Sequence, residues 1–180
     1  DAISYFKGKT SDIYSQYKAI QARIDGLVQN LSGETNPNQN TLLTVVSHSL
    51  GTVVLSDYLY DKRDSLESND QLTFSNFFTL GSPIALYANR FYNHQSPSNP
   101  FANFKPQKVK DPKGVWVNLF DEDDIVGYPI RPVNSYCEKA VTADLNVSVG
   151  SFLSCGTPAS HTGYWEDKKV GKIIAEKLAI

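Results

Sequence analysis

Hydrophobic residues follow two different rhythms along this chain. In three stretches they recur every three or four positions, the spacing of one helix face, which predicts helices over residues 11–31, from Gly51 to about Lys62, and from Glu166 onward. Elsewhere they form short continuous runs at residues 41–46, 77–80 and 115–120. Runs of this kind are typical of strands that are buried on both faces of a parallel sheet.

The order of these elements predicts the fold class. Helices and strands alternate, which indicates an α/β fold with a mostly parallel sheet, in a single domain over residues 1–180. Segment 84–113 separates the second and third predicted strands and is rich in proline, asparagine, serine and aromatic residues. Loops this long within a compact domain are commonly functional, so we expect a cap or lid loop at 84–113.

Composition and charge exclude several classes of protein. Hydrophobic residues make up 41% of the chain and charged residues 20%, which argues against disordered, collagen-like and fibrous proteins. The 17 Lys and Arg are scattered and face 19 Asp and Glu, so we expect no nucleic acid as a partner. No apolar run approaches the roughly 20 residues that cross a bilayer, so we expect a soluble protein without a transmembrane segment. Cys137 and Cys155 leave open both a disulfide and the compartment, with the cytoplasm favoured over secretion.

A short motif, Ser47-His48-Ser49-Leu50-Gly51, lies between the predicted strand at 41–46 and the helix that follows it. A nucleophile elbow needs this placement, because its tight turn exposes the serine hydroxyl and requires small residues two positions before and after the serine. Ser47 and Gly51 are small, and the Leu50 N–H at the helix start would face a developing oxyanion. The alternative is an ordinary strand-to-helix turn in which Ser49 caps the helix.

A serine nucleophile needs a base, and the chain has three histidines. His48 neighbours Ser49 and should leave the turn in another direction. His94 lies in the long polar segment 84–113, where an exposed or substrate-lining position is expected. His161 lies in a loop between the last predicted strand and the C-terminal helix, and its order in the chain favours it as the base.

The base in turn needs a carboxylate that orients it. Asp121, Glu122, Asp123 and Asp124 follow the third predicted strand at its carboxyl end, the edge where Ser49 lies if the strands are parallel. The spacing lacks the glycine and glutamate of an EF-hand calcium loop. We expect one of the four to be used, with the other three forming a solvated acidic turn.

The order of a serine, an acid and a histidine, together with three local segments, resembles the lipase and esterase branch of the α/β-hydrolases. Segment 45–52 is similar to the nucleophile elbow of that branch. Segment 124–129 is similar to the part of class 3 fungal lipases that carries the triad aspartate, which points to Asp124. Segment 160–164 resembles the loop that carries the triad histidine, His161. The resemblance covers residues 40–180 and implies a three-layer sandwich of α/β-hydrolase type.

Two departures from the family pattern affect this interpretation. The first glycine of the elbow motif is Ser47 here, which adds a Cβ and a hydroxyl where strand and helix approach. Upstream of Ser49 the chain shows one helix and a linker, without the first strands of the fold or the His-Gly loop that carries the second oxyanion donor. The chain therefore resembles the C-terminal two-thirds of such a hydrolase, truncated at the N-terminus.

The resemblance implies a serine hydrolase that cleaves carboxylic esters through an acyl-enzyme. Ser49 would attack the carbonyl carbon, His161 would move the proton, Asp124 would hold the imidazole and the Leu50 N–H would bind the oxyanion. The expected substrate is a small-molecule ester or lipid, and neither a metal nor an organic cofactor is implied.

The aromatic residues of segment 84–113 suggest a substrate pocket. We expect Tyr87 and Phe91, together with His48, to contact the substrate. The alternative is that these aromatic residues anchor a long loop to the body of the domain. Two other functions stay open: a catalytically silent binding domain with the same fold, and an acyltransferase that uses the same three residues.

Overall fold

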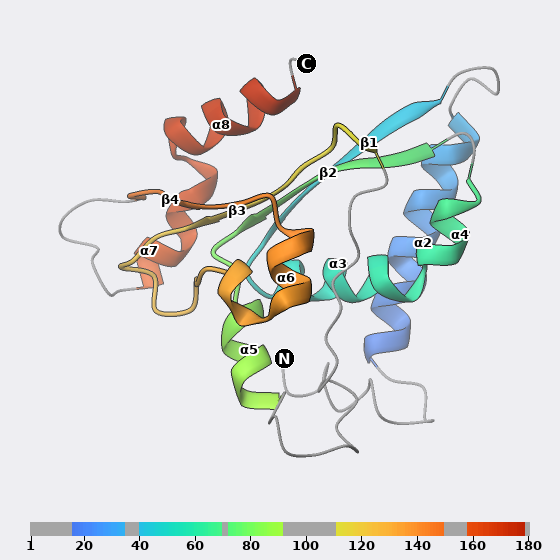
Figure 1. Ribbon diagram of the computed structural model, residues 1–180. Coiled ribbons are helices and arrows are strands. Elements are labelled where there is room, and N and C mark those ends of the chain that lie inside the picture. The colour runs from blue at the N-terminus through green and yellow to red at the C-terminus, as the bar shows by residue number, and fades with distance from the viewer. Residues whose placement is uncertain (1–15, 35–39, 70–71, 92–110, 150–157, 179–180) are drawn as a thin grey trace.

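The computed structural model describes residues 16–34, 40–69, 72–91, 111–149 and 158–178 (Figure 1). In chain order the elements, with η marking a 3-10 helix, are α2 (Gln16–Glu34), β1 (Thr41–His48), α3 (Leu50–Asp61), α4 (Arg63–Glu67), β2 (Leu72–Leu80), α5 (Ile84–Phe91), β3 (Trp116–Phe120), η1 (Arg131–Val133), α6 (Ser135–Ala140), β4 (Ala143–Asn146), α7 (Pro158–Thr162), η3 (Gly163–Trp165) and α8 (Lys168–Leu178). The predicted α/β class is confirmed.

Four parallel strands form one sheet in the order β1-β2-β3-β4. Successive strands of the described chain are therefore neighbours, and each connection crosses over through helices. Each new strand is added at the same edge of the sheet, and crossover connections between parallel strands are almost always right-handed. The helices of these connections therefore lie on one face of the sheet. Helices α3, α5 and α6 lie on that face, and α8 lies on the other (Figure 1).

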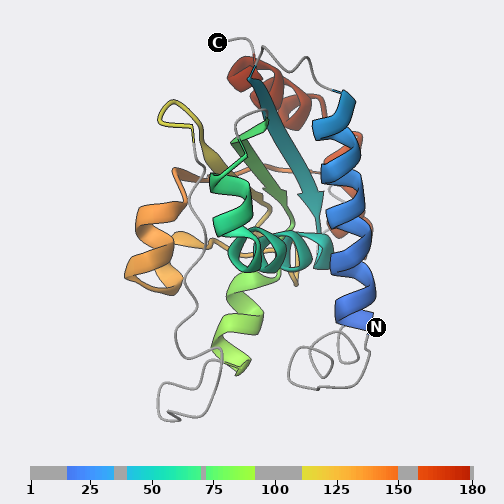
Figure 2. The ribbon, with the colours of Figure 1, turned by 90° about the vertical axis from the view of Figure 1, so that its right-hand side faces the viewer.

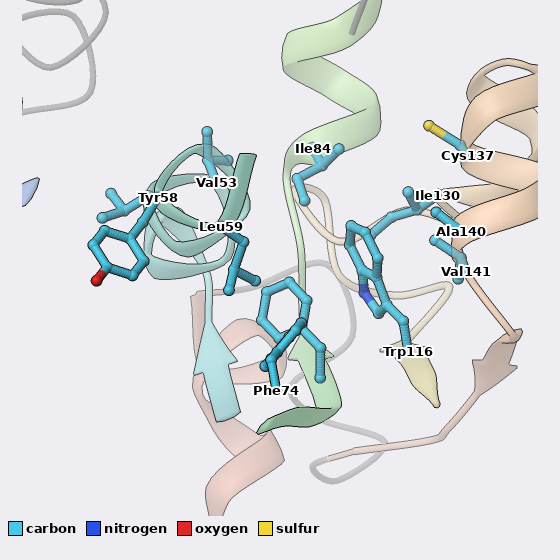
Figure 3. Packing of buried hydrophobic residues seen from close by; sticks show 12 residues of the cluster. Val53, Tyr58, Leu59, Phe74, Ile84, Trp116, Ile130, Cys137, Ala140 and Val141 are labelled. Atoms are coloured by element: carbon cyan, nitrogen blue, oxygen red, sulfur yellow. The ribbon is translucent and has the colours of Figure 1, made fainter. Parts of the chain in front are cut away.

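The continuous apolar runs arise because the strands are covered on both faces. Phe77 and Phe78 are neighbours in β2, and both are fully buried, yet they belong to different core clusters. Phe77 and Trp116 pack toward α3, α5 and α6. Partly buried residues of α2, which lies beside the β1 edge of the sheet, pack against the same cluster (Figure 2). Phe78 and Val117 pack instead toward Val170 of α8. Figure 3 shows how Phe74 and Trp116 of the sheet face the residues of the helical layer.

The structure corrects several sequence-based expectations about elements. The first part of the predicted loop 84–113 is the helix α5, while residues 92–110 lie outside the described part of the chain. Helix α6 and strand β4 were not predicted. Asn134 caps α6, since its side chain accepts hydrogen bonds from the backbone N–H groups of Tyr136 and Cys137. This cap residue was the sequence signal that could have located α6.

Candidate active site

Ser49 is the single residue between β1 and α3, and it adopts an unusual backbone conformation. Its φ is 56°, the only positive φ among the described non-glycine residues. Such conformations cost about 1–3 kcal/mol and persist where the surrounding structure holds them. Here the Ser49 N–H donates to the Leu80 carbonyl at 3.0 Å, and the Ser49 carbonyl accepts from the Thr52 N–H and hydroxyl at 3.0 and 2.7 Å.

Ser49 occupies the N-cap position of α3, and its carbonyl accepts from the Thr52 N–H, but its side chain does not cap the helix. The side chain of Ser49 makes no capping hydrogen bond to α3, so the alternative interpretation of the motif is wrong. Ser47 is buried, and its hydroxyl has no hydrogen-bond partner among the described residues. Gly51 differs from the expectation, because a Cβ added there would meet no described atom within 4 Å. The close approach that the motif implies at Gly51 is therefore absent among the described residues.

The structure brings His161 of α7 to Ser49, although 111 residues separate them in the chain. The His161 Nε2 lies 2.6 Å from Ser49 Oγ, and the His161 Nδ1 lies 2.9 and 3.1 Å from the two carboxylate oxygens of Asp124. Because a carboxylate can only accept, Nδ1 carries the hydrogen of a neutral His161, and Nε2 is left to accept from the serine hydroxyl. The three predicted residues thus form one hydrogen-bonded series.

The Asp124 carboxylate is fully buried and its oxygens are held by further donors. One oxygen accepts from the Val126 N–H at 3.0 Å and the other from the Tyr164 hydroxyl at 2.9 Å. Tyr164 is buried, and burial raises the pKa of its phenol well above the usual value, with the negative charge of Asp124 and its hydrogen bond acting in the same direction. Sequence analysis did not find Tyr164; its signal was its position three residues after His161.

Glycine residues allow the backbone to approach this carboxylate. A Cβ on Gly81 would lie 2.8 Å from Asp124 Oδ2 and 2.8 Å from the Tyr164 ring, and Gly81 has a φ of 51°. A Cβ on Gly127 would lie 2.6 Å from the same carboxylate oxygen. Real contacts of a Cβ are essentially never this short, so both positions need glycine for Asp124 to keep its place.

Of the other acidic residues after β3, Glu122 and Asp123 are exposed, as expected of a solvated turn, whereas Asp121 is not. Asp121 is buried, and its carboxylate accepts from the Asp123 and Val149 N–H groups at 2.9 and 2.7 Å. Glu122 accepts from the Asn146 side chain at 2.8 Å. The expectation of a solvated turn is therefore wrong for Asp121. Within the described residues, no group of three His, Cys, Asp or Glu side chains could hold a metal ion.

His48 contacts the segment that carries His161. Its Nε2 lies 2.6 Å from the backbone carbonyl of His161, and because a carbonyl only accepts, this nitrogen donates. The two imidazole rings lie 4.7 Å apart, and the rings of Tyr164 and Trp165 flank His48 as well. Partial burial lowers the pKa of His48, against the opposing effect of its hydrogen bond to His161. A contact of His48 with substrate stays a prediction.

The remaining predicted site residues have different surroundings. Leu50 begins α3, so its N–H lies in the first helical turn, where N–H groups have no intrahelical acceptor. Tyr87 of α5 is half-buried against the core cluster of the helical layer, as the anchoring alternative expects. Three of the residues named from the sequence lie outside the described part of the chain: the Phe91 side chain, His94 and Cys155. The Cys137 thiol is free and buried, and burial raises the pKa of this thiol to about 12.

Comparisons of the chain with protein-family models, with curated proteins and with solved structures found no match. The parallel sheet is compatible with an α/β-hydrolase, and it is shared with other α/β folds. Among the helices that the structure describes, none combines the length and the apolar character needed to cross a bilayer.

Proposed function

We propose that this protein is a serine hydrolase of the α/β-hydrolase type that cleaves carboxylic esters through an acyl-enzyme. The observation that carries the proposal is the hydrogen-bonded series from the Ser49 hydroxyl through His161 to the buried Asp124 carboxylate. A serine hydroxyl is a weak nucleophile until an adjacent base accepts its proton, and this series supplies the base and the group that orients it.

The proposed reaction has two halves. In the first, Ser49 Oγ bonds to the carbonyl carbon while His161 Nε2 accepts the serine proton, and that proton then passes to the alcohol as the ester bond breaks. In the second, His161 accepts a proton from water, the resulting hydroxide attacks the acyl-serine, and the proton returns to Ser49 as the acid leaves. Asp124 stabilises the imidazolium formed in each half.

The backbone around Ser49 supports this role. The positive φ of Ser49 is a strained state, and strain at a non-glycine residue is typical of a nucleophile held between a strand and a helix. At the start of α3, the Leu50 N–H and the helix dipole favour negative charge on a substrate oxygen beside Ser49. We assign the Leu50 N–H as one oxyanion donor.

Labelling with a fluorophosphonate probe tests the proposal. We expect the wild-type protein to form a phosphonyl-serine adduct and to hydrolyse p-nitrophenyl acetate, and Ser49→Ala to lose the label and at least about 10³-fold in hydrolysis rate. Ser47→Ala is the matched control, because it removes a buried hydroxyl without hydrogen-bond partners two residues away and should keep both activities. A wild-type protein that never reacts, or a label that persists in Ser49→Ala, would refute the proposal.

A further inference from the structure

Two buried hydroxyl groups connect the backbone carbonyl of Ser49 to the start of α5. The Thr52 hydroxyl donates to the Ser49 carbonyl at 2.7 Å and lies 2.8 Å from the Ser82 hydroxyl. A hydroxyl has one hydrogen to donate, and that of Thr52 goes to Ser49, so Ser82 is the donor between the two hydroxyls. The Ser82 oxygen accepts in turn from the Ile84 N–H at 3.3 Å. The hydrogen bonds therefore run in one direction, from Ile84 through Ser82 and Thr52 to the Ser49 carbonyl.

Every member of this hydroxyl series is shielded from water. Thr52 and Ser82 are fully buried, and Ile84 is buried as well. A hydrogen bond in such surroundings is stronger than one in water, and bonds that follow one another polarise each other. A threonine hydroxyl that donates to the carbonyl three residues earlier is a common local contact in helices. Here the same contact receives a further hydrogen bond from another element, which holds the Ser49 carbonyl in one direction.

The direction of the Ser49 carbonyl fixes the direction of the Leu50 N–H, because both belong to one planar peptide group. In a trans peptide the C=O and N–H bonds point in opposite directions. The Ser49 carbonyl points into α3, where it accepts from the Thr52 N–H at 3.0 Å as well as from the Thr52 hydroxyl. The Leu50 N–H therefore points away from α3, and no described backbone carbonyl accepts a hydrogen bond from it.

We infer that Thr52, supported by Ser82, is a positioning residue that keeps the Leu50 N–H aimed at the developing oxyanion. This inference rests on the proposed function, because it concerns the oxyanion donor assigned there. Such a donor is effective when it already points at the place where charge develops, and removal of one donor slows a reaction by about 10²–10³-fold. Loss of the Thr52 hydroxyl leaves the Leu50 N–H in the chain but allows its peptide group to turn, so the effect should be smaller.

The test compares kcat/KM for p-nitrophenyl acetate and for its thionoester, in which sulfur replaces the carbonyl oxygen. In both reactions Ser49 Oγ bonds to the same carbon and p-nitrophenol leaves. The negative charge develops on oxygen in the ester and on sulfur, a weak hydrogen-bond acceptor, in the thionoester. A misdirected Leu50 N–H should therefore slow the ester more than the thionoester, whereas a displaced Ser49 or His161 would slow both reactions alike.

Thr52→Val removes the hydroxyl and keeps a side chain of nearly the same shape. We expect kcat/KM for the ester to fall by about 10–100-fold, and the ratio of ester to thionoester to fall by at least about fivefold. Thr52→Ser keeps the donor and should stay within about threefold of wild type for both substrates. Ser56→Ala is the matched control, because Ser56 is a buried residue one turn further along α3 whose hydroxyl has no hydrogen-bond partner among the described residues. It should behave as wild type.

The outcomes separate this inference from the proposed function. If the wild type hydrolyses neither substrate and never reacts with the fluorophosphonate, the proposed function fails and the inference fails with it. If the wild type is active and Thr52→Val keeps the wild-type ratio, whether its two rates are unchanged or fall together, the inference is overturned while the proposed function stands.

Thermal unfolding of each variant verifies that it is folded. If Thr52→Val does not fold, Ser82→Ala carries the same test, because it removes the donor to Thr52 and leaves the threonine in place. The ratio of ester to thionoester should then fall by about twofold or more. An unchanged ratio in Ser82→Ala would overturn the inference.

Discussion

Replacing Gly81 by alanine tests whether the turn after β2 is shaped around the Asp124 carboxylate. Gly81 has a φ of 51°, and an added Cβ would lie 2.8 Å from both Asp124 Oδ2 and a carbon of the Tyr164 ring. Neither neighbour can move away easily, because the Tyr164 ring is fully buried and the carboxylate is held by His161. The substitution should therefore destabilise the fold and displace the carboxylate.

The size of the effect follows from two contributions. A residue with a Cβ in the left-handed region costs about 1–2 kcal/mol relative to glycine. Forcing an extra carbon into a filled site costs a further ~1–3 kcal/mol. The sum, about 2–5 kcal/mol, is a large fraction of the ~5–15 kcal/mol by which folded domains are stable. The variant should still fold, with much lower stability.

Urea unfolding followed by tryptophan fluorescence measures this loss, with Gly171→Ala as the matched control. Gly171 lies inside α8, and a Cβ there would meet no described atom within 4 Å, so its replacement should stabilise the protein by up to about 1 kcal/mol. The unfolding midpoint of Gly81→Ala should fall by about 1 M or more. A free energy of unfolding within about 0.5 kcal/mol of wild type would show that the close approach at Gly81 is not a constraint.

Two further predictions concern the residues that hold Asp124 and His161. Tyr164→Phe should cost about 1–3 kcal/mol, because it removes a donor to Asp124 and an acceptor of a backbone N–H. The raised pKa of Tyr164 stabilises the fold below pH 10, the ordinary value for the phenol, and that stability is lost as the pH rises above it. The free energy of unfolding should thus fall less steeply above pH 10 in the phenylalanine variant than in wild type, and equal slopes would contradict this assignment. His48→Leu, which removes the donor to the His161 carbonyl, should slow fluorophosphonate labelling by about 10–100-fold, whereas His48→Gln keeps a donor and should retain most of the rate. Equal rates in the two variants would argue against a positioning role.

The elements that sequence analysis predicted are those in which local pattern and burial agree. Strand β1 and helix α3 follow directly from an apolar run and a helical spacing on either side of Ser49. Strand β4 was missed because two of its four residues, Asp144 and Asn146, are polar. Asp144 stays in the sheet because its carboxylate accepts hydrogen bonds from the backbone N–H groups of Ile130 and Arg131 and from the Asn118 side chain. These partners lie 13 or more residues away, so no local pattern reveals them.

By itself, the sequence determined the α/β class and the three side chains worth placing together, since periodicity and residue order are local properties of the chain. The tertiary structure decided the rest. It brought His161 Nε2 to 2.6 Å from Ser49 Oγ and placed the Tyr164 hydroxyl as a donor to the buried Asp124 carboxylate. It also made glycine necessary at position 81. It also turned His48 toward the His161 carbonyl and Asp121 inward. Such contacts depend on how parallel strands align their carboxyl ends at one edge, which is a property of packing between distant segments.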